Sequence, residues 1–91
     1  MSLLFPIGLM VATPTALAAF ARNGQTPLPF LQRHQSGDWG DLDKDDREAN
    51  NAALKNGSRI LSAYYLNDRE KIWIITEADR SSTCVLLPED Y

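Results

Sequence analysis

Residues 59–87 decide the fold of this chain. They read RILSAYYL (59–66), NDRE (67–70), KIWIITE (71–77), ADRS (78–81) and STCVLL (82–87). Three runs rich in β-branched and aromatic residues are separated by two short polar breaks, a pattern typical of antiparallel strands joined by tight turns. The sequence therefore predicts a three-stranded antiparallel meander.

Two short helices are predicted before the meander. The dipeptide Thr-Pro occurs at residues 13–14 and again at 26–27. Each copy places a capping hydroxyl directly before a proline, and this arrangement favours the start of a helix. We expect helices over residues 16–22 and 27–35.

A third helix is predicted over residues 44–56, with Asp43 as its N-cap and Gly57 at its end. Its apolar face consists mainly of alanines, which allow close packing but bury little surface. The apolar segment 5–12 could form an edge strand or an extended lead-in. Pro6 favours an edge position, because proline cannot donate a hydrogen bond within a β-ladder.

The length and the order of the predicted elements, a possible strand, three helices and then three strands, indicate one α+β domain spanning residues 1–91, with three short helices packed on the meander. The 44% hydrophobic and 23% charged content is that of a globular chain. A net charge of -3 is too small to drive wholesale binding to a polyanion. The single cysteine, Cys84, suits a reducing compartment, and no apolar run reaches the ~18 residues of a membrane span. A cytoplasmic location without membrane contact is expected.

Counting across hairpins with even loops sets Tyr64 opposite Trp73, and Ile74 opposite Val85. One face of the sheet is then aliphatic and is expected beneath the helices. The other face keeps large apolar side chains that three short helices cannot also cover, which usually means a partner. We predict an interaction surface there, most simply for homodimer formation, made of Tyr64, Trp73, Ile75 and Leu86. In the alternative, residues 3–11 fold over this face.

No metal or cofactor site is expected from the sequence. Residues 41–45 reproduce the D-x-D-x-D opening of a calcium loop, but Asp46 stands where that loop needs glycine, and Ala52 where it needs glutamate. The acidic window 38–48 is therefore interpreted as helix capping and a solvated patch. His34 is the only histidine, so a two-histidine metal site is excluded.

Two polar groups are candidate binding sites. Arg33, His34, Asp38 and Trp39 precede the third helix, and Glu77, Asp79 and Arg80 lie in the second hairpin. In the hairpin, Glu77 and Asp79 would be paired carboxylates and Arg80 an anion clamp. The competing interpretation is turn chemistry, in which Asp79 bonds the local backbone. A Cys84–His34 nucleophile pair is disfavoured, because no cation or helix N-terminus adjoins Cys84 to lower its pKa.

Several motifs resemble those of a known family. They are FPIG (5–8), VATP (11–14), RHQSGDWGDL (33–42), WIITEADRSST (73–83) and LLPEDY (86–91). The chain resembles, over almost its whole length, short bacterial proteins of plasmids and other mobile elements that are often labelled type I restriction endonuclease subunit M. It departs from them at Leu9, where members tend to carry glutamine. The mobile-element setting implies, by association, an accessory role toward host defence or plasmid maintenance. The methylation activity of the label is not expected, because this chain has no glycine-rich strand–helix turn to supply a methyl-donor site and no catalytic motif.

Three functional hypotheses follow. The first is a small non-enzymatic interaction module that binds itself or a host or plasmid protein. The second is a weak nucleic-acid-binding protein that stacks bases on Tyr64 and Trp73, although the acidic balance makes nucleic acid the less favoured partner. The third is an enzyme with an acid/base site near the 77–83 hairpin.

Overall fold

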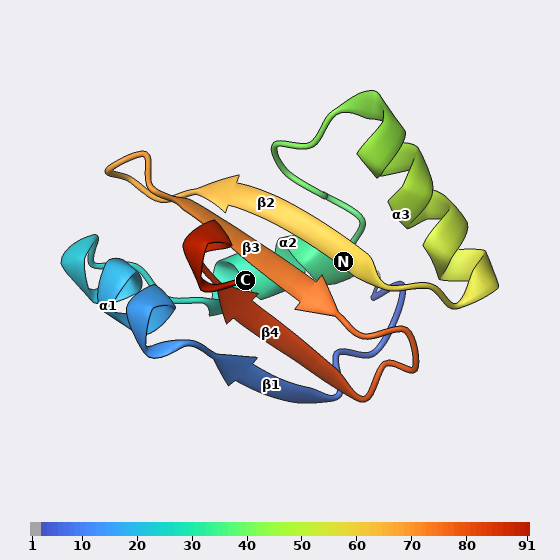
Figure 1. Cartoon of the computed structure of the whole chain (residues 1–91), viewed down its shortest axis with the longest axis horizontal. Helices are drawn as coiled ribbons and strands as arrows, with labels where there is room; N and C mark the ends of the chain where they lie inside the picture. The colour runs from blue at the N-terminus through green and yellow to red at the C-terminus, as the bar shows by residue number, and fades with distance from the viewer. Residues whose placement is uncertain (1–2) are drawn as a thin grey trace.

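The structure, a computed structural model, describes residues 3–91. One sheet with strand order β1-β4-β3-β2 is accompanied by three helices and a C-terminal 3-10 turn (Figure 1). The elements are β1 (Leu9–Ala12), α1 (Pro14–Arg22), α2 (Leu28–Gln35), α3 (Lys44–Asn56), β2 (Ile60–Tyr65), β3 (Lys71–Thr76), β4 (Ser82–Leu86) and η1 (Pro88–Asp90). The fold is α+β, as the sequence predicts.

The predicted capping residues begin α1 and α3, but the predicted cap of α2 is wrong, because the N-cap of that helix is Pro27 and it makes no side-chain hydrogen bond. The Thr13 side chain accepts a hydrogen bond from the Ala16 N–H (3.1 Å), and α1 begins at Pro14, two residues earlier than predicted. Asp43 caps α3 in the same way, and Gly57 ends that helix in the left-handed conformation at φ +75°. The local sequence rules for helix ends are therefore sufficient for the start of α1 and for both ends of α3, but not for the start of α2.

The N-terminal apolar segment forms a strand only over Leu9–Ala12. This strand, β1, runs parallel to β4, so the sheet is mixed, whereas the meander itself is antiparallel. Residues 3–8 run toward α2 instead: the Leu4 N–H donates to the Gln35 carbonyl (2.8 Å), and the Phe5 ring packs against His34 at 5.1 Å. The alternative in which residues 3–11 cover the second face of the meander is wrong.

The first hairpin has a different register from the predicted one. The Leu66 N–H donates to the Glu70 carbonyl (2.9 Å), which leaves an odd loop of three residues. Arg69, the last of them, takes the left-handed conformation at φ +71°. Tyr64 consequently pairs with residue 72, and not with Trp73.

A shift of one residue exchanges the two faces of β2. Tyr64 lies beneath the helices and is 2% exposed, whereas Tyr65 is 52% exposed and shares a face with Trp73. The second hairpin keeps the predicted register, with Ile74 opposite Val85. The predicted placement of Tyr64 on the interaction surface is wrong, and so is the idea that Tyr64 and Trp73 form one platform for stacking bases.

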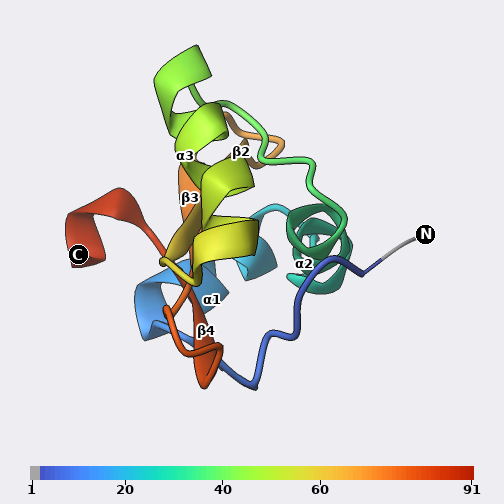
Figure 2. The ribbon, with the colours of Figure 1, turned by 90° about the vertical axis from the view of Figure 1, so that its right-hand side faces the viewer.

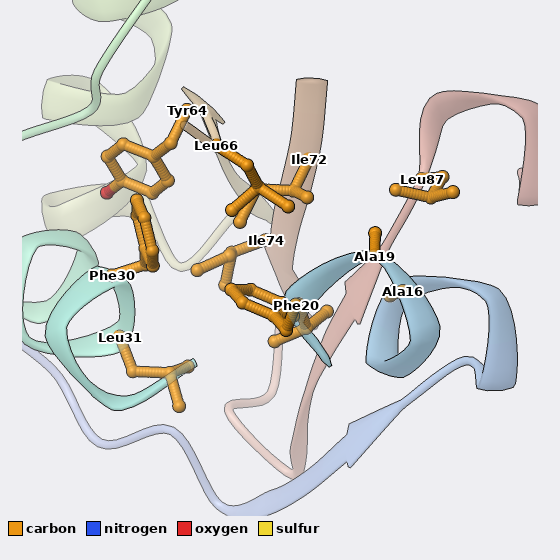
Figure 3. Close-up of a cluster of buried hydrophobic side chains, with 11 residues drawn as sticks. Ala16, Ala19, Phe20, Phe30, Leu31, Tyr64, Leu66, Ile72, Ile74 and Leu87 are labelled. Carbon is orange, nitrogen blue, oxygen red and sulfur yellow. The ribbon is translucent and has the colours of Figure 1, made fainter. Parts of the chain in front are cut away.

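The larger core lies between the helices and what we call the back of the sheet. Figure 2 views the sheet nearly edge-on. Helix α2 lies on one side of it, the back, and η1 lies on the other side, which we call the front. Phe30 packs between Phe20 and Tyr64, with ring centroids 5.8 and 5.5 Å away (Figure 3). The other buried side chains of this cluster are Ala16, Ala19, Leu31, Leu66, Ile72, Ile74, Val85 and Leu87.

Candidate interaction surface

The front of the sheet carries mostly apolar side chains, although no α-helix lies across it (Figures 1 and 2). The strand registers place on it Leu9, Val11, Leu61, Ala63, Tyr65, Lys71, Trp73, Ile75, Ser82, Cys84 and Leu86. Ile75 and Leu86 are buried there, while Trp73 is half-buried. We define the front-face patch as the apolar members that keep exposed surface, namely Leu9, Val11, Leu61, Tyr65, Trp73 and Cys84.

The C-terminal turn η1 lies over part of this front face (Figure 1). The Asp90 carboxylate accepts hydrogen bonds from the Thr13 and Thr15 hydroxyls (2.7 and 2.5 Å), and these bonds lower the pKa of Asp90. Beyond the turn, the Tyr91 ring meets the Trp73 ring edge-on at 5.8 Å. A short, tethered turn therefore covers the centre of the face and leaves apolar side chains exposed on both sides.

The β2 edge of the sheet is closed by the chain itself. The Asn50 side chain on α3 donates to the Leu61 carbonyl (2.6 Å) and accepts from the Leu61 N–H (3.1 Å), as a neighbouring strand would. Two residues along, the Ala63 N–H donates to the Trp39 carbonyl (3.1 Å), and the Asp41 N–H donates to the Ala63 carbonyl (2.7 Å). Pairing of β2 with another chain is thereby blocked.

We expect Asn50→Ala to destabilise the protein by about 2 kcal/mol, because the partly buried N–H and C=O of Leu61 would both lose the partner that the buried Asn50 side chain provides. Chemical denaturation measures this loss. Glu48→Ala, on the exposed side of the same helix, is the control and should change the free energy of unfolding by less than about 0.5 kcal/mol. Equal effects of the two substitutions would contradict this role of Asn50.

Arg33 and Asp38 line a cleft of about 390 Å³ beside the β2 edge. They form an ion pair at 2.6 Å, which raises the pKa of Arg33 and lowers that of Asp38. The Arg33 guanidinium also lies 4.5 Å from the Tyr64 ring centroid, and the Tyr64 hydroxyl donates to the Asp38 carbonyl (2.6 Å). Asp41 in the same cleft pairs with Lys71 at 3.5 Å. Charge is thus balanced within the chain, and the cleft favours no charged ligand.

His34 belongs to a buried chain of hydrogen bonds whose direction can be worked out. The Thr83 hydroxyl donates to the Ile7 carbonyl (2.8 Å), so it can only accept from Thr76 (2.7 Å). Thr76 must then accept from His34 Nε2 (2.9 Å), so Nε2 carries a proton. In the neutral imidazole, Nδ1 then accepts from the Ser62 hydroxyl (2.5 Å).

The environment of His34 supports this assignment and makes the residue structural. Burial, and to a smaller extent the positive charge of Arg80, lower the pKa of His34 to about 4. Its neighbour Trp39 is also buried and donates from Nε1 to Asn51 (3.1 Å). Cys84 lies on the front of the sheet, away from His34, and burial raises the pKa of its thiol. The geometry does not assemble a nucleophile pair.

The 77–83 hairpin is held by turn chemistry, as the competing interpretation predicts. The Asp79 side chain accepts from the Ser81 N–H (3.0 Å). Arg80 is not an anion clamp, because its guanidinium donates to backbone carbonyls of the chain itself. These carbonyls belong to Ser58, Glu77 and Ala78 (2.7, 3.1 and 3.2 Å) and to Ala53 in the last turn of α3 (3.0 Å). The exposed Glu77 and Asp79 carboxylates therefore do not share a site with a free Arg80 or an accessible His34.

The acidic window 38–48 is used in local structure. Asp43 caps α3, and Asp45 and Asp46 lie in its first turn, where the helix dipole favours negative charge. Glu48 lies 4.0 Å from Lys44, one turn away on the same helix. Within residues 3–91, no group of three or more histidine, cysteine or acidic side chains is placed to hold a metal ion.

A scan against models of protein families, a search of curated proteins and a search of solved structures each found no match to this chain. In the part of the chain that the structure describes, every helix is too short or too polar to cross a lipid bilayer. The geometry of the front-face patch therefore carries the functional argument.

Proposed function

We propose that this protein is a small non-enzymatic interaction module that self-associates through its front face. The observation that carries the proposal is the front-face patch, in which Leu9 is 69%, Tyr65 52% and Val11 41% exposed. Apolar surface of this kind on one side of a sheet favours association, because covering it removes that surface from water.

The polar groups support a non-enzymatic role. Arg80 and His34 are engaged in hydrogen bonds within the protein, and Arg33 is paired with Asp38. A general acid or base must reach a substrate, and a buried neutral imidazole with both nitrogens bonded does not. The front-face patch, by contrast, keeps apolar surface that contacts within the chain do not cover.

Sedimentation velocity over a wide concentration range tests the proposal. We expect a concentration-dependent shift from monomer to dimer in the wild type. Leu9→Asp should weaken the association at least about tenfold, because it places a charge on the patch, where association would remove it from water. Leu9 is mostly exposed and does not belong to the core cluster, so the variant is expected to fold.

Leu28→Asp is the matched control, since Leu28 is 60% exposed and lies on α2, behind the sheet. It should leave the association unchanged. A wild-type chain that remains strictly monomeric, or equal weakening by both substitutions, would overturn the proposal.

The resemblance to plasmid-related proteins supports a more specific setting. In that setting the module is a cytoplasmic accessory protein of mobile elements, and its self-associated form engages a host or plasmid protein. Expression of the tagged wild type and of Leu9→Asp in a bacterial host, followed by cross-linking, tests this extension. A host protein captured by the wild type and lost with Leu9→Asp would support it, and identical captures would contradict it.

A further inference from the structure

The two edges of the sheet differ in whether other segments of the chain cover them. Asn50 and the 39–41 loop cover the edge of β2, whereas β1 forms the other border of the sheet, with no segment of residues 3–91 beyond it (Figure 1). Edge strands are usually protected by charges, prolines or bulges. Strand β1 reads LMVA, and the first charged side chain of the whole sequence is Arg22.

The backbone of β1 offers a defined set of free groups. The Leu9 N–H donates to the Ser81 carbonyl and the Thr13 N–H to the Val85 carbonyl, both at 3.0 Å, so the odd-numbered residues face β4. In a strand, alternate residues direct their N–H and C=O groups to opposite sides. The groups of Met10 and Ala12 therefore point away from the sheet.

We propose that two copies of the chain pair antiparallel through β1, with Val11 opposite Val11 of the second copy on the two-fold axis. This inference rests on the proposed self-association and places the contact at the β1 border of the front face, where Leu9 and Val11 lie; Tyr65, on β2 at the opposite border of the sheet, stays outside this contact. The result is a continuous eight-stranded sheet in which the two front faces lie on the same side.

This register pairs more of the outward N–H and C=O groups of β1 than the two adjacent registers do. With Val11 on the axis, Met10 and Ala12 each exchange two hydrogen bonds with Ala12 and Met10 of the second copy. With Ala12 on the axis, Met10 would face Pro14, which has no N–H to donate. With Met10 on the axis, Ala12 would face Gly8, which lies outside the strand at φ +61°.

The second copy fits this edge by its side chains as well. Leu9 and Val11 lie on the front face, so pairing would join the β1 ends of the two front-face patches into one apolar strip. Because β1 and its flanks carry no charged side chain, two copies meet there without like-charge repulsion. The paired strands are short, so the dimer is expected to be weak and reversible.

A charge exchange at Val11 tests the register. Val11→Lys and Val11→Glu should each weaken dimerisation at least about tenfold, because two like charges would face each other across the axis. An equimolar mixture of the two variants should recover dimers, measured by sedimentation velocity. Leu17→Lys and Leu17→Glu, at a 51% exposed position on α1, are the matched controls and should dimerise like the wild type, alone or mixed.

Met10→Pro is a second, independent variant. It removes the outward N–H of residue 10 but none of the N–H groups that face β4, so it should abolish dimerisation while the circular dichroism spectrum and melting temperature stay close to wild type. A dimer that survives Met10→Pro and both Val11 variants, but is lost in Tyr65→Asp, would overturn edge pairing and leave front-face association standing. A strictly monomeric wild type would overturn both and leave the β1 edge to a strand of another protein.

Discussion

Acidification from about pH 6.5 to about pH 4 is expected to lower the free energy of unfolding by about 3 kcal/mol through His34 alone. The unfolded chain binds the proton at the ordinary pKa of 6.5, whereas burial lowers the pKa of His34 in the folded protein to about 4. The neutral imidazole therefore contributes stability above pH 6.5, and this contribution is lost as the pH falls toward 4. A loss of this size is a large part of the stability of a small domain.

The variant His34→Gln separates the pH dependence caused by His34 from that of the other titrating groups. A glutamine amide can donate and accept like the neutral imidazole but does not titrate, so its free energy of unfolding should stay nearly constant between pH 6.5 and 4. Asp38, Asp79 and Asp90 have pKa values lowered from 3.8, so their contributions are lost below this window. Urea denaturation at several pH values measures both proteins, and parallel pH profiles would show that His34 is not the titrating group.

Much of the fold could be predicted from local patterns. Alternation, capping residues and turn residues identified the three helices, the three strands of the meander and the register of the second hairpin. The predicted register of the first hairpin is wrong because the left-handed position of its loop is occupied by Arg69. A glycine at that position would have indicated a three-residue loop. Contacts from elsewhere support that loop, since Asn23 and Gln25 side chains accept hydrogen bonds from its backbone.

The candidate site was predicted less well, because its geometry depends on contacts between distant residues. Trp73 lies on the predicted face, but one register shift replaced Tyr64 with Tyr65. Nothing local marks Asn50 as a substitute for a strand, since it is one of several polar residues in a helix whose apolar face is mainly alanine. The openness of β1 likewise follows from its position at the border of the sheet, and sequence patterns do not give the order of strands.

Gly40→Ala is expected to destabilise the protein by about 3 kcal/mol or more. A Cβ atom at residue 40 would lie 2.0 Å from the Ala63 carbonyl oxygen and 2.6 Å from a ring carbon of Tyr64. The 39–41 loop would have to withdraw from β2, which breaks the hydrogen bonds that Trp39 and Asp41 make with Ala63. Thermal and urea denaturation measure the loss.

Gly57→Ala is the matched control, because Gly57 has the same φ of +75° but open space around its Cβ position. It should cost about 1 kcal/mol, the strain of the left-handed backbone alone, so the difference between the variants isolates the close contact with β2. Gly40→Ala also uncovers part of the β2 edge, and a chain with both sheet edges accessible can add partners on each side. Sedimentation should then detect species larger than dimers for Gly40→Ala but not for Gly57→Ala, and equal stability and size distributions of the two variants would contradict this function of the loop.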